Sequence, residues 1–222
     1  MQQRMDTKTM VTLALLSAVA YLTVLVVRIP IVPAVGFLNY EPKDIIIVIG
    51  GFLFGPLAVV AMSAAVSFLE MITISPDGWI GLVMNVLSTC SFACSAAIIY
   101  KKSRDLKGAV IGLVVGVLLV VIVMLLWNYF LTPIYRGVPR TVIAGLLIPG
   151  FLPFNLLKYG INAAIVMLAY KPISRALRQA RLMPASEGGS VSKGKVNVGV
   201  ILLSCFVIIT CVLFILVLQG RI

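Results

Sequence analysis

Long apolar runs without charged side chains alternate along this chain with short polar segments. The runs free of Asp, Glu, Lys and Arg are residues 9–27, 45–69, 78–100, 108–135, 141–157 and 196–220. A helix rises 1.5 Å per residue, so about 20 residues cross the roughly 30 Å hydrocarbon layer of a bilayer. One span each is therefore predicted for 9–27, 108–131, 148–170 and 197–219, and Lys158 lies inside the third of these.

The stretch 45–100 fits either two or three spans by length. Turn signals at Gly55-Pro56 and at Ser75-Pro76-Asp77-Gly78 favour three, with a short second span over about 44–54. With three spans and a cytoplasmic N-terminus, twelve basic residues lie inside and five outside. Two spans would reverse these numbers, against the preference of basic residues for the cytoplasmic side.

Beyond the sixth span the composition changes. Residues 171–182 are basic and predict a helix on the cytoplasmic surface, and 183–196 predict a flexible basic linker. Residues 197–222 predict an additional transmembrane helix, which would place the C-terminus outside the cell. The chain is thus expected to consist of a six-helix membrane domain at 1–182, the linker and the extra helix.

Composition supports an all-α integral membrane protein. Of 222 residues, 61% are apolar and 11% charged, which excludes an ordinary soluble domain. The net charge of +11 comes from basic residues at the ends of apolar runs, so we expect a lipid bilayer and not nucleic acid as the surrounding partner.

No set of residues predicts catalysis or a metal site. The sequence has no histidine and only seven acidic residues. The Gly189–Lys195 segment matches a phosphate-binding loop pattern, but Val196 stands where Ser or Thr would hold magnesium. We therefore expect neither an enzyme nor a cofactor, and any ATP hydrolysis would belong to another subunit.

The polar groups inside the spans are the candidates for binding. Asn85, Asn128, Asn155 and Lys158 fall in the outer halves of three spans. Amides carry both donors and acceptors, which suits a neutral polyhydroxylated or heterocyclic ligand. Hydrogen bonds between helices for the amides, and a lysine reaching to the interface, are the alternatives. Glu70, near the outer end of the third span, is expected to reach the interface.

Two further groups of residues accompany this cluster. Aromatic side chains at the same depth, among them Trp79 and Tyr135, form either an interfacial belt or a surface for stacking a flat ligand. The proline-stiffened loop at 30–44 is long enough to cover a cavity, although Asp44 can instead cap the second helix.

Small residues one turn apart mark the first span. Ala14 and Ala18 would let another helix approach closely, in the inner half of the span.

Three motifs together resemble a known family. The loop Phe37-Leu38-Asn39-Tyr40-Glu41-Pro42-Lys43-Asp44 leads into Gly50-Gly51-Phe-Leu-Phe-Gly55-Pro56, and Met84-Asn85 and Asn155-x-x-Lys158 follow. Over about residues 8–178 the sequence resembles the riboflavin-specific substrate-binding (S) component of energy-coupling factor (ECF) transporters. The seventh helix is not part of that pattern.

The resemblance implies six helices that hold a vitamin near the outer face, beneath the first loop. It implies loop contacts from Leu38, Asn39 and Tyr40, ordering of the loop by Asp44, and hydrogen bonds to the flavin from Asn85, Asn128, Asn155 and Lys158. It also implies docking through Ala14 and Ala18 on a membrane T component coupled to two cytoplasmic ATPase subunits. The alternatives are an S component for FMN or another vitamin and, in a different class, a small membrane enzyme or assembly factor.

Overall fold

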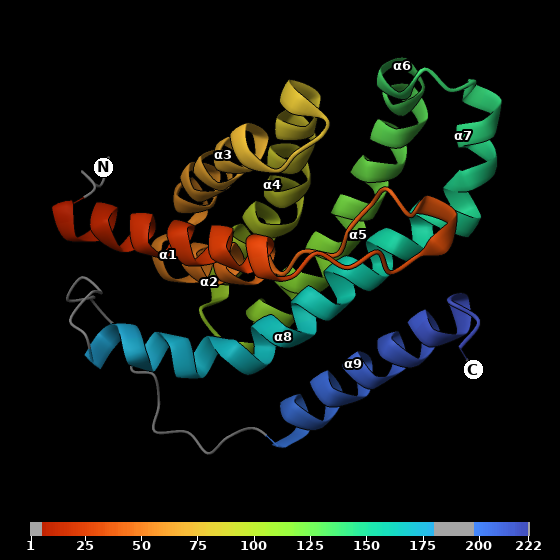
Figure 1. Cartoon of the computed structure of the whole chain (residues 1–222). Helices are drawn as coiled ribbons and strands as arrows, with labels where there is room; N and C mark the ends of the chain where they lie inside the picture. The colour runs from red at the N-terminus through yellow and green to blue at the C-terminus, as the bar shows by residue number, and fades with distance from the viewer. Residues whose placement is uncertain (1–5, 180–197, 222) are drawn as a thin grey trace.

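The computed structural model describes residues 6–179 and 198–221, and within these ranges the chain is helical, without strands (Figure 1). Six segments are long and apolar enough to cross a membrane: α1 (Thr7–Val26), α3 (Pro56–Thr73), α4 (Gly78–Ser103), α5 (Leu106–Phe130), Arg140–Ile173 and α9 (Val198–Leu218). The segment Arg140–Ile173 combines α7 (Arg140–Leu146), the π-helical turn η2 (Leu147–Phe151) and the first part of α8 (Leu152–Gln179). The short helices η1 (Pro33–Val35) and α6 (Thr132–Arg136) lie in connections.

The predicted breaks in the stretch 45–100 are confirmed. Helix α2 (Lys43–Phe54) ends at Gly55, whose φ of 94° few residues other than glycine adopt, and Pro56 begins α3. The second break falls between Thr73 and Gly78. The short second span therefore exists as a helix of 12 residues.

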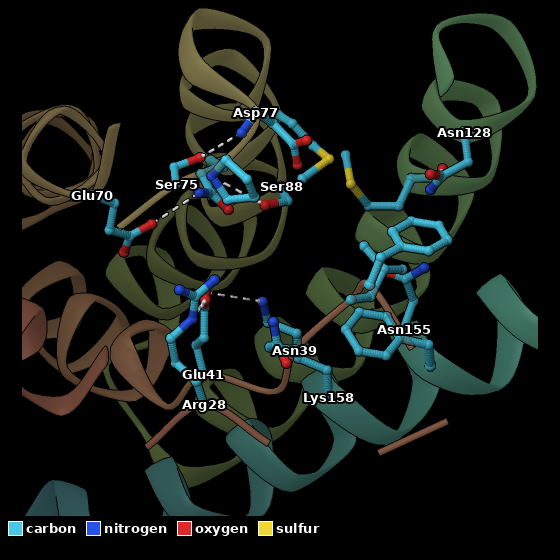
Figure 2. A pocket seen from close by; sticks show the side chains of 18 of the residues that line it. Arg28, Asn39, Glu41, Glu70, Ser75, Asp77, Ser88, Asn128, Asn155 and Lys158 are labelled. Carbon is cyan, nitrogen blue, oxygen red and sulfur yellow. Dashed lines mark hydrogen bonds and ion pairs between the residues drawn. The ribbon is translucent and has the colours of Figure 1, made fainter. Parts of the chain in front are cut away.

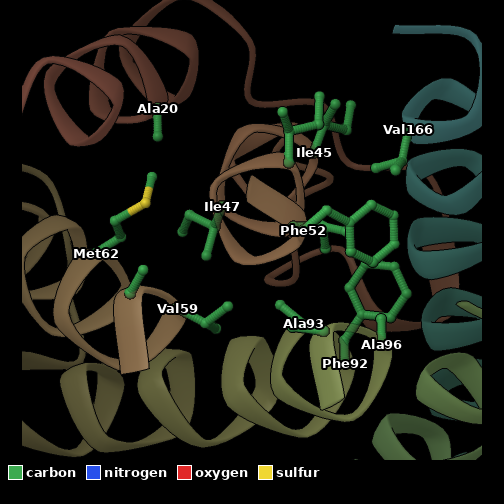
Figure 3. Close-up of a cluster of buried hydrophobic side chains, with 14 of the residues drawn as sticks. Ala20, Ile45, Ile47, Phe52, Val59, Met62, Phe92, Ala93, Ala96 and Val166 are labelled. Atoms are coloured by element: carbon green, nitrogen blue, oxygen red, sulfur yellow. The ribbon is translucent and has the colours of Figure 1, made fainter. Parts of the chain in front are cut away.

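This short helix forms the centre of the bundle (Figure 3). Its apolar side chains pack in one cluster with residues of α1, α3, α4 and α8. Gly51 permits the close approach, because a Cβ there would lie 2.4 Å from Val59 Cγ2 and 3.1 Å from Ala97 Cβ. Because α2 lies among longer helices, it does not need the length of a full membrane span.

Helix α8 is longer than the span predicted at 148–170. It begins after the π-helical turn and continues through Pro172 to Gln179. The basic helix predicted at 171–182 is thus, as far as Gln179, the continuation of α8, which Pro172 does not end. The predicted domain boundary after residue 182 and the linker at 183–196 lie outside the described residues.

The seventh helix is present as α9, which lies beside α8 (Figure 1). A second apolar cluster, here called the loop-side cluster, joins the first loop to α7, η2 and the first part of α8. It consists of Ile31, Val32, Val35, Tyr40, Ile143, Phe151, Phe154, Leu157 and Ile161. The fold thus agrees with a six-helix bundle of α1–α5 and α8 plus one additional helix.

Candidate ligand-binding site

A pocket of about 810 Å³, including space open to solvent, lies at one end of the bundle (Figure 2). Its walls come from the first loop, the end of α3, the α3–α4 connection, the start of α4, the end of α5 and the start of α8. The lining residues are Arg28, Phe37, Leu38, Asn39, Glu41, Glu70, Ile74, Ser75, Pro76, Asp77, Gly81, Met84, Asn85, Ser88, Met124, Asn128, Phe154, Asn155, Lys158 and Tyr159. The part of this space that is open to the centres of water-sized molecules measures about 100 Å³.

Six of the ten predicted binding residues line this pocket: Leu38, Asn39, Asn85, Asn128, Asn155 and Lys158. They come from four separate parts of the chain, namely the first loop, α4, α5 and α8. These parts meet because the start of α4, the end of α5 and the start of α8 all lie on this side of the bundle. The polar groups predicted within the spans therefore share one cavity and do not lie scattered between helices.

Local hydrogen bonds hold two of the amides, and one of them keeps a free acceptor for a ligand. The Asn155 Nδ2 donates to the Phe151 carbonyl oxygen at 2.8 Å, and no described residue donates to its Oδ1. The Asn128 Nδ2 donates to the Met124 carbonyl at 2.6 Å, while its Oδ1 accepts from Thr132 at 2.9 Å. These local bonds fix the orientation of each amide, and the free Oδ1 of Asn155 remains as an acceptor.

Lys158 is buried, with 6% of its surface exposed, and does not reach to the interface. Its Nζ lies 3.9 Å from Glu41 Oε2 and 5.7 Å from the ring centre of Tyr159. The ammonium group makes no hydrogen bond to any described residue, so its donors are available within the pocket.

A buried ion-pair network forms one wall of the pocket. Glu41 lies 3.2 Å from Arg28 Nε and 3.5 Å from Lys43 Nζ. Lys43 in turn donates to both carboxylate oxygens of Glu70, at 2.6 and 2.5 Å, and Asn85 Nδ2 donates to Glu70 at 2.8 Å. Glu70 is therefore an interior residue and not an interfacial one.

This network was not predicted from the sequence. Lys43 and Glu70 are separated by 27 positions, and only their packing between α2 and α3 brings them together. An acidic residue within an apolar run was the available signal, because such a residue normally has a partner.

The surroundings of Glu41 keep its carboxyl ionised. Burial by itself raises the pKa of Glu41, but the positive charges of Lys43, Lys158 and Arg28 outweigh the burial and hold the pKa below its ordinary value. The loop residue Glu41 thus acts as the shared counter-ion for three cations.

The rim of the pocket carries a second, more exposed ion pair. Arg136 Nη2 lies 3.0 Å from Asp77 Oδ1, and its guanidinium stacks 4.7 Å from the ring centre of Phe37. These contacts join α6, the α3–α4 connection and the first loop.

The structure does not bring the remaining four predicted residues to the pocket. Trp79 is 70% exposed, because it lies on the opposite face of α4 from Gly81, Met84, Asn85 and Ser88. Tyr135 lies in α6 beside Arg136, outside the lining.

Tyr40 and Asp44 have structural partners beneath the pocket. The Tyr40 hydroxyl donates to Asn162 Oδ1 at 3.0 Å, and burial, followed by the charge of Asp44, raises the pKa of Tyr40 to about 12. Asp44 is fully buried and accepts a hydrogen bond from Thr89 at 2.6 Å, with no cap on α2 from its side chain.

The predicted partner residues Ala14 and Ala18 are both exposed on α1. Their neighbours Leu13, Leu16 and Ser17 face the bundle instead. Among residues 6–179 and 198–221, no group of three His, Cys, Asp or Glu side chains is placed to hold a metal ion.

A membrane-embedded bundle with a polar pocket under a long loop defines a membrane protein that binds a small molecule. The profile of one family, described as ECF transporter, substrate-specific component, matches residues 8–170. This chain belongs to that family. The family consists of transporter components, so the predictions of a multi-pass membrane protein that is not an enzyme are confirmed.

Curated relatives and a solved structure agree with this assignment. The riboflavin transporter RibU of Staphylococcus aureus is 28% identical over 179 residues, which cover 78% of this chain and 93% of the relative. The riboflavin transporter FmnP of Bacillus subtilis is 25% identical over 186 residues, covering 80% and 97%. The structure of the S component of a bacterial ECF transporter matches with a TM-score of 0.65 and 26% identity, over 77% of this chain and 98% of that one.

Proposed function

We propose that this chain is the riboflavin-binding subunit of an ECF importer. The observation that carries the proposal is the lining of the pocket, which combines amides, an available ammonium group and aromatic walls in one cavity. Riboflavin presents a flat ring system with several acceptors and a donor, together with a chain of hydroxyl groups. Asn155 Oδ1 accepts from such a donor, and Lys158 donates to ring or hydroxyl oxygens. The names of the curated relatives support the same ligand.

The charge balance of the pocket favours the neutral flavin over its phosphate ester. Each described cation at the pocket already lies near a carboxylate: Arg28 and Lys158 near Glu41, and Lys43 near Glu70. Arg28, Lys43 and Lys158 exceed Glu41 and Glu70 by one positive charge, whereas a phosphate monoester adds a charge of about −1.5 to −2 at pH 7, so part of its charge would lie near the carboxylates without compensation. FMN is therefore the weaker ligand.

The pocket faces the outside of the cell in this proposal. The basic segments at 101–107 and 171–179 lie at the other ends of α4 and α8 from the pocket, and the preference of basic residues for the cytoplasm supports this orientation. The N-terminus is then cytoplasmic, and the C-terminus is extracellular if α9 spans the membrane.

Uptake requires partners in this proposal. The chain docks on a membrane T component coupled to two cytoplasmic ATPase subunits, and it delivers riboflavin to the cytoplasm from that complex. The exposed positions of Ala14 and Ala18 support α1 as part of the docking face, because small residues permit close helix approach.

A fluorescence titration of the purified protein tests the ligand. Riboflavin added to the protein in detergent is expected to lose fluorescence with saturation at one ligand per chain, and FMN is expected to compete about tenfold or more weakly. The absence of saturable riboflavin binding would overturn the proposed function. Tighter binding of FMN than of riboflavin would overturn the argument from charge.

A further inference from the structure

The helix α9 lies beyond the part of the chain that the family profile matches, which ends at residue 170. Most of its surface faces outward, and Ser204 is the one residue of α9 that is buried. A helix of this kind can serve purely as a membrane anchor. Its inward face includes the buried Ser204 and continues to the C-terminal end, where the contacts point to a more specific role.

Three side chains of α9 pack against the loop-side cluster: Cys211, Ile215 and Leu218. Their spacing of four and three residues places them on one face of the helix. The cluster that they contact includes Ile31, Val32, Val35 and Tyr40 of the first loop. It also includes Phe154, which lines the pocket.

Two further contacts locate α9 on the back of the pocket wall. A Cβ at Gly160 of α8 would lie 3.9 Å from Cys211 Sγ, which is ordinary van der Waals contact. At the end of α9, Gln219 Nε2 donates to the Pro30 carbonyl oxygen at 3.4 Å. In Figure 1 the C-terminal end of α9 accordingly lies near the start of α8. Because lipid is as apolar as these side chains, close packing and not a hydrophobic driving force accounts for the contact.

We propose that α9 is a positioning element of the binding site, which holds the base of the first loop and the start of α8 in place behind the pocket. This proposal rests on the proposed function only in those experiments that use riboflavin as the probe. The loop is already closed at its base by the backbone pair Ile29–Tyr40, with N···O distances of 3.2 and 2.8 Å. The contacts of α9 restrain the residues between these two positions, and their loss frees the loop that carries Leu38 and Asn39.

A disulfide cross-link tests where α9 lies. The full-length variant Gly160→Cys is expected to form a disulfide with Cys211 under mild oxidation, because a Cβ at position 160 would lie 3.9 Å from Cys211 Sγ, within the reach of one added sulfur atom. Trypsin cleavage after Arg181, Lys193 or Lys195 then leaves the two fragments linked until reductant is added. The matched control, Gly160→Cys with Cys211→Ser, retains the exposed Cys205 and is expected to give no link. No cross-link in the first variant, or equal links in both, would overturn the proposal.

Truncating the side chains of α9 that pack on the loop-side cluster tests whether α9 restrains the first loop. The full-length variant Ile215→Ala with Leu218→Ala is expected to accelerate amide hydrogen exchange in residues 28–40 at least about threefold, since exchange follows local opening. Riboflavin is expected to dissociate roughly tenfold faster. The control, Leu202→Ala with Leu213→Ala, alters side chains that are 65% and 51% exposed and is expected to change neither rate.

The two readouts separate this proposal from the proposed function. Unchanged exchange in the Ile215→Ala, Leu218→Ala variant would overturn the positioning role even if riboflavin binds. A wild-type protein that binds no riboflavin would overturn the proposed function, while the exchange rates would still decide the role of α9.

Discussion

The buried pair of Lys43 and Glu70 offers the sharpest test of the interior of the binding site. Lys43 is 1% exposed and Glu70 2% exposed, and their charged atoms are 2.5 Å apart. The variant Lys43→Met keeps the apolar length of the side chain and removes its charge. Glu70 then retains only the hydrogen bond from Asn85. A buried carboxylate without its cation strongly destabilises the folded state.

The expected loss follows from this geometry. Removing one partner of a buried pair costs about 3–5 kcal/mol. For a chain of 222 residues this corresponds to a fall in Tm of about 6–20 °C. The measurement is the thermal unfolding of the detergent-solubilised protein, followed by loss of the monodisperse peak in size-exclusion chromatography.

A second variant and a control isolate the pair. Lys43→Met with Glu70→Gln removes both charges and keeps an acceptor for Asn85, so its loss of stability is expected to be at least about 1 kcal/mol smaller than the sum of the single losses. The control is Asp77→Asn, which breaks an ion pair whose side chains are 18% and 30% exposed, with an expected cost of less than about 1 kcal/mol. A Lys43→Met variant that melts within about 2 °C of wild type, or strict additivity of the two changes, would refute the reasoning.

Three further predictions concern binding, docking and pH. Asn155→Ala and Lys158→Ala are each expected to weaken riboflavin binding by about 1–3 kcal/mol, or roughly 5–150-fold, in a fluorescence titration. The Tm of both variants is expected to stay nearly unchanged. Unaltered affinity in both variants would remove these residues from the site. Ala14→Trp is expected to retain riboflavin binding and to abolish cellular uptake of labelled riboflavin. The control Val19→Trp, at another exposed position of α1, is expected to retain both binding and uptake. Normal uptake by Ala14→Trp would exclude the docking role. The pKa of Glu41 is lowered in the folded protein, so its stabilising contribution is complete above the ordinary value of 4.5 and is lost as the pH falls further. The Tm of wild type should therefore fall more than that of Glu41→Gln upon acidification through this range, and parallel curves would contradict the assignment.

The sequence was sufficient to predict the features that depend on local chemistry. Gly55-Pro56 ended the second helix as expected, because a positive φ and a proline at a helix start act within a few residues. Asn85, Asn128, Asn155 and Lys158 could be grouped because span boundaries and helix direction fix the depth of each side chain in the bilayer.

Features that depend on helix rotation and packing were not predicted. Depth alone did not distinguish Trp79 from Asn85, although helical periodicity separates them by about 120° around α4. The partner of Glu70 could not be found because Lys43 precedes it by 27 residues and reaches it only through the fold. Tyr40 and Asp44 were grouped with the ligand contacts, whereas their side-chain hydrogen bonds go to Asn162 and Thr89.

The most direct test of the account is to identify what the protein carries when it is purified. An absorption spectrum of the full-length protein in mild detergent, followed by denaturation and mass spectrometry of the released material, identifies the ligand without added probe. We expect a yellow protein that releases riboflavin at up to one molecule per chain. A colourless protein that also leaves the fluorescence of added riboflavin unchanged would contradict the assignment of this pocket to riboflavin.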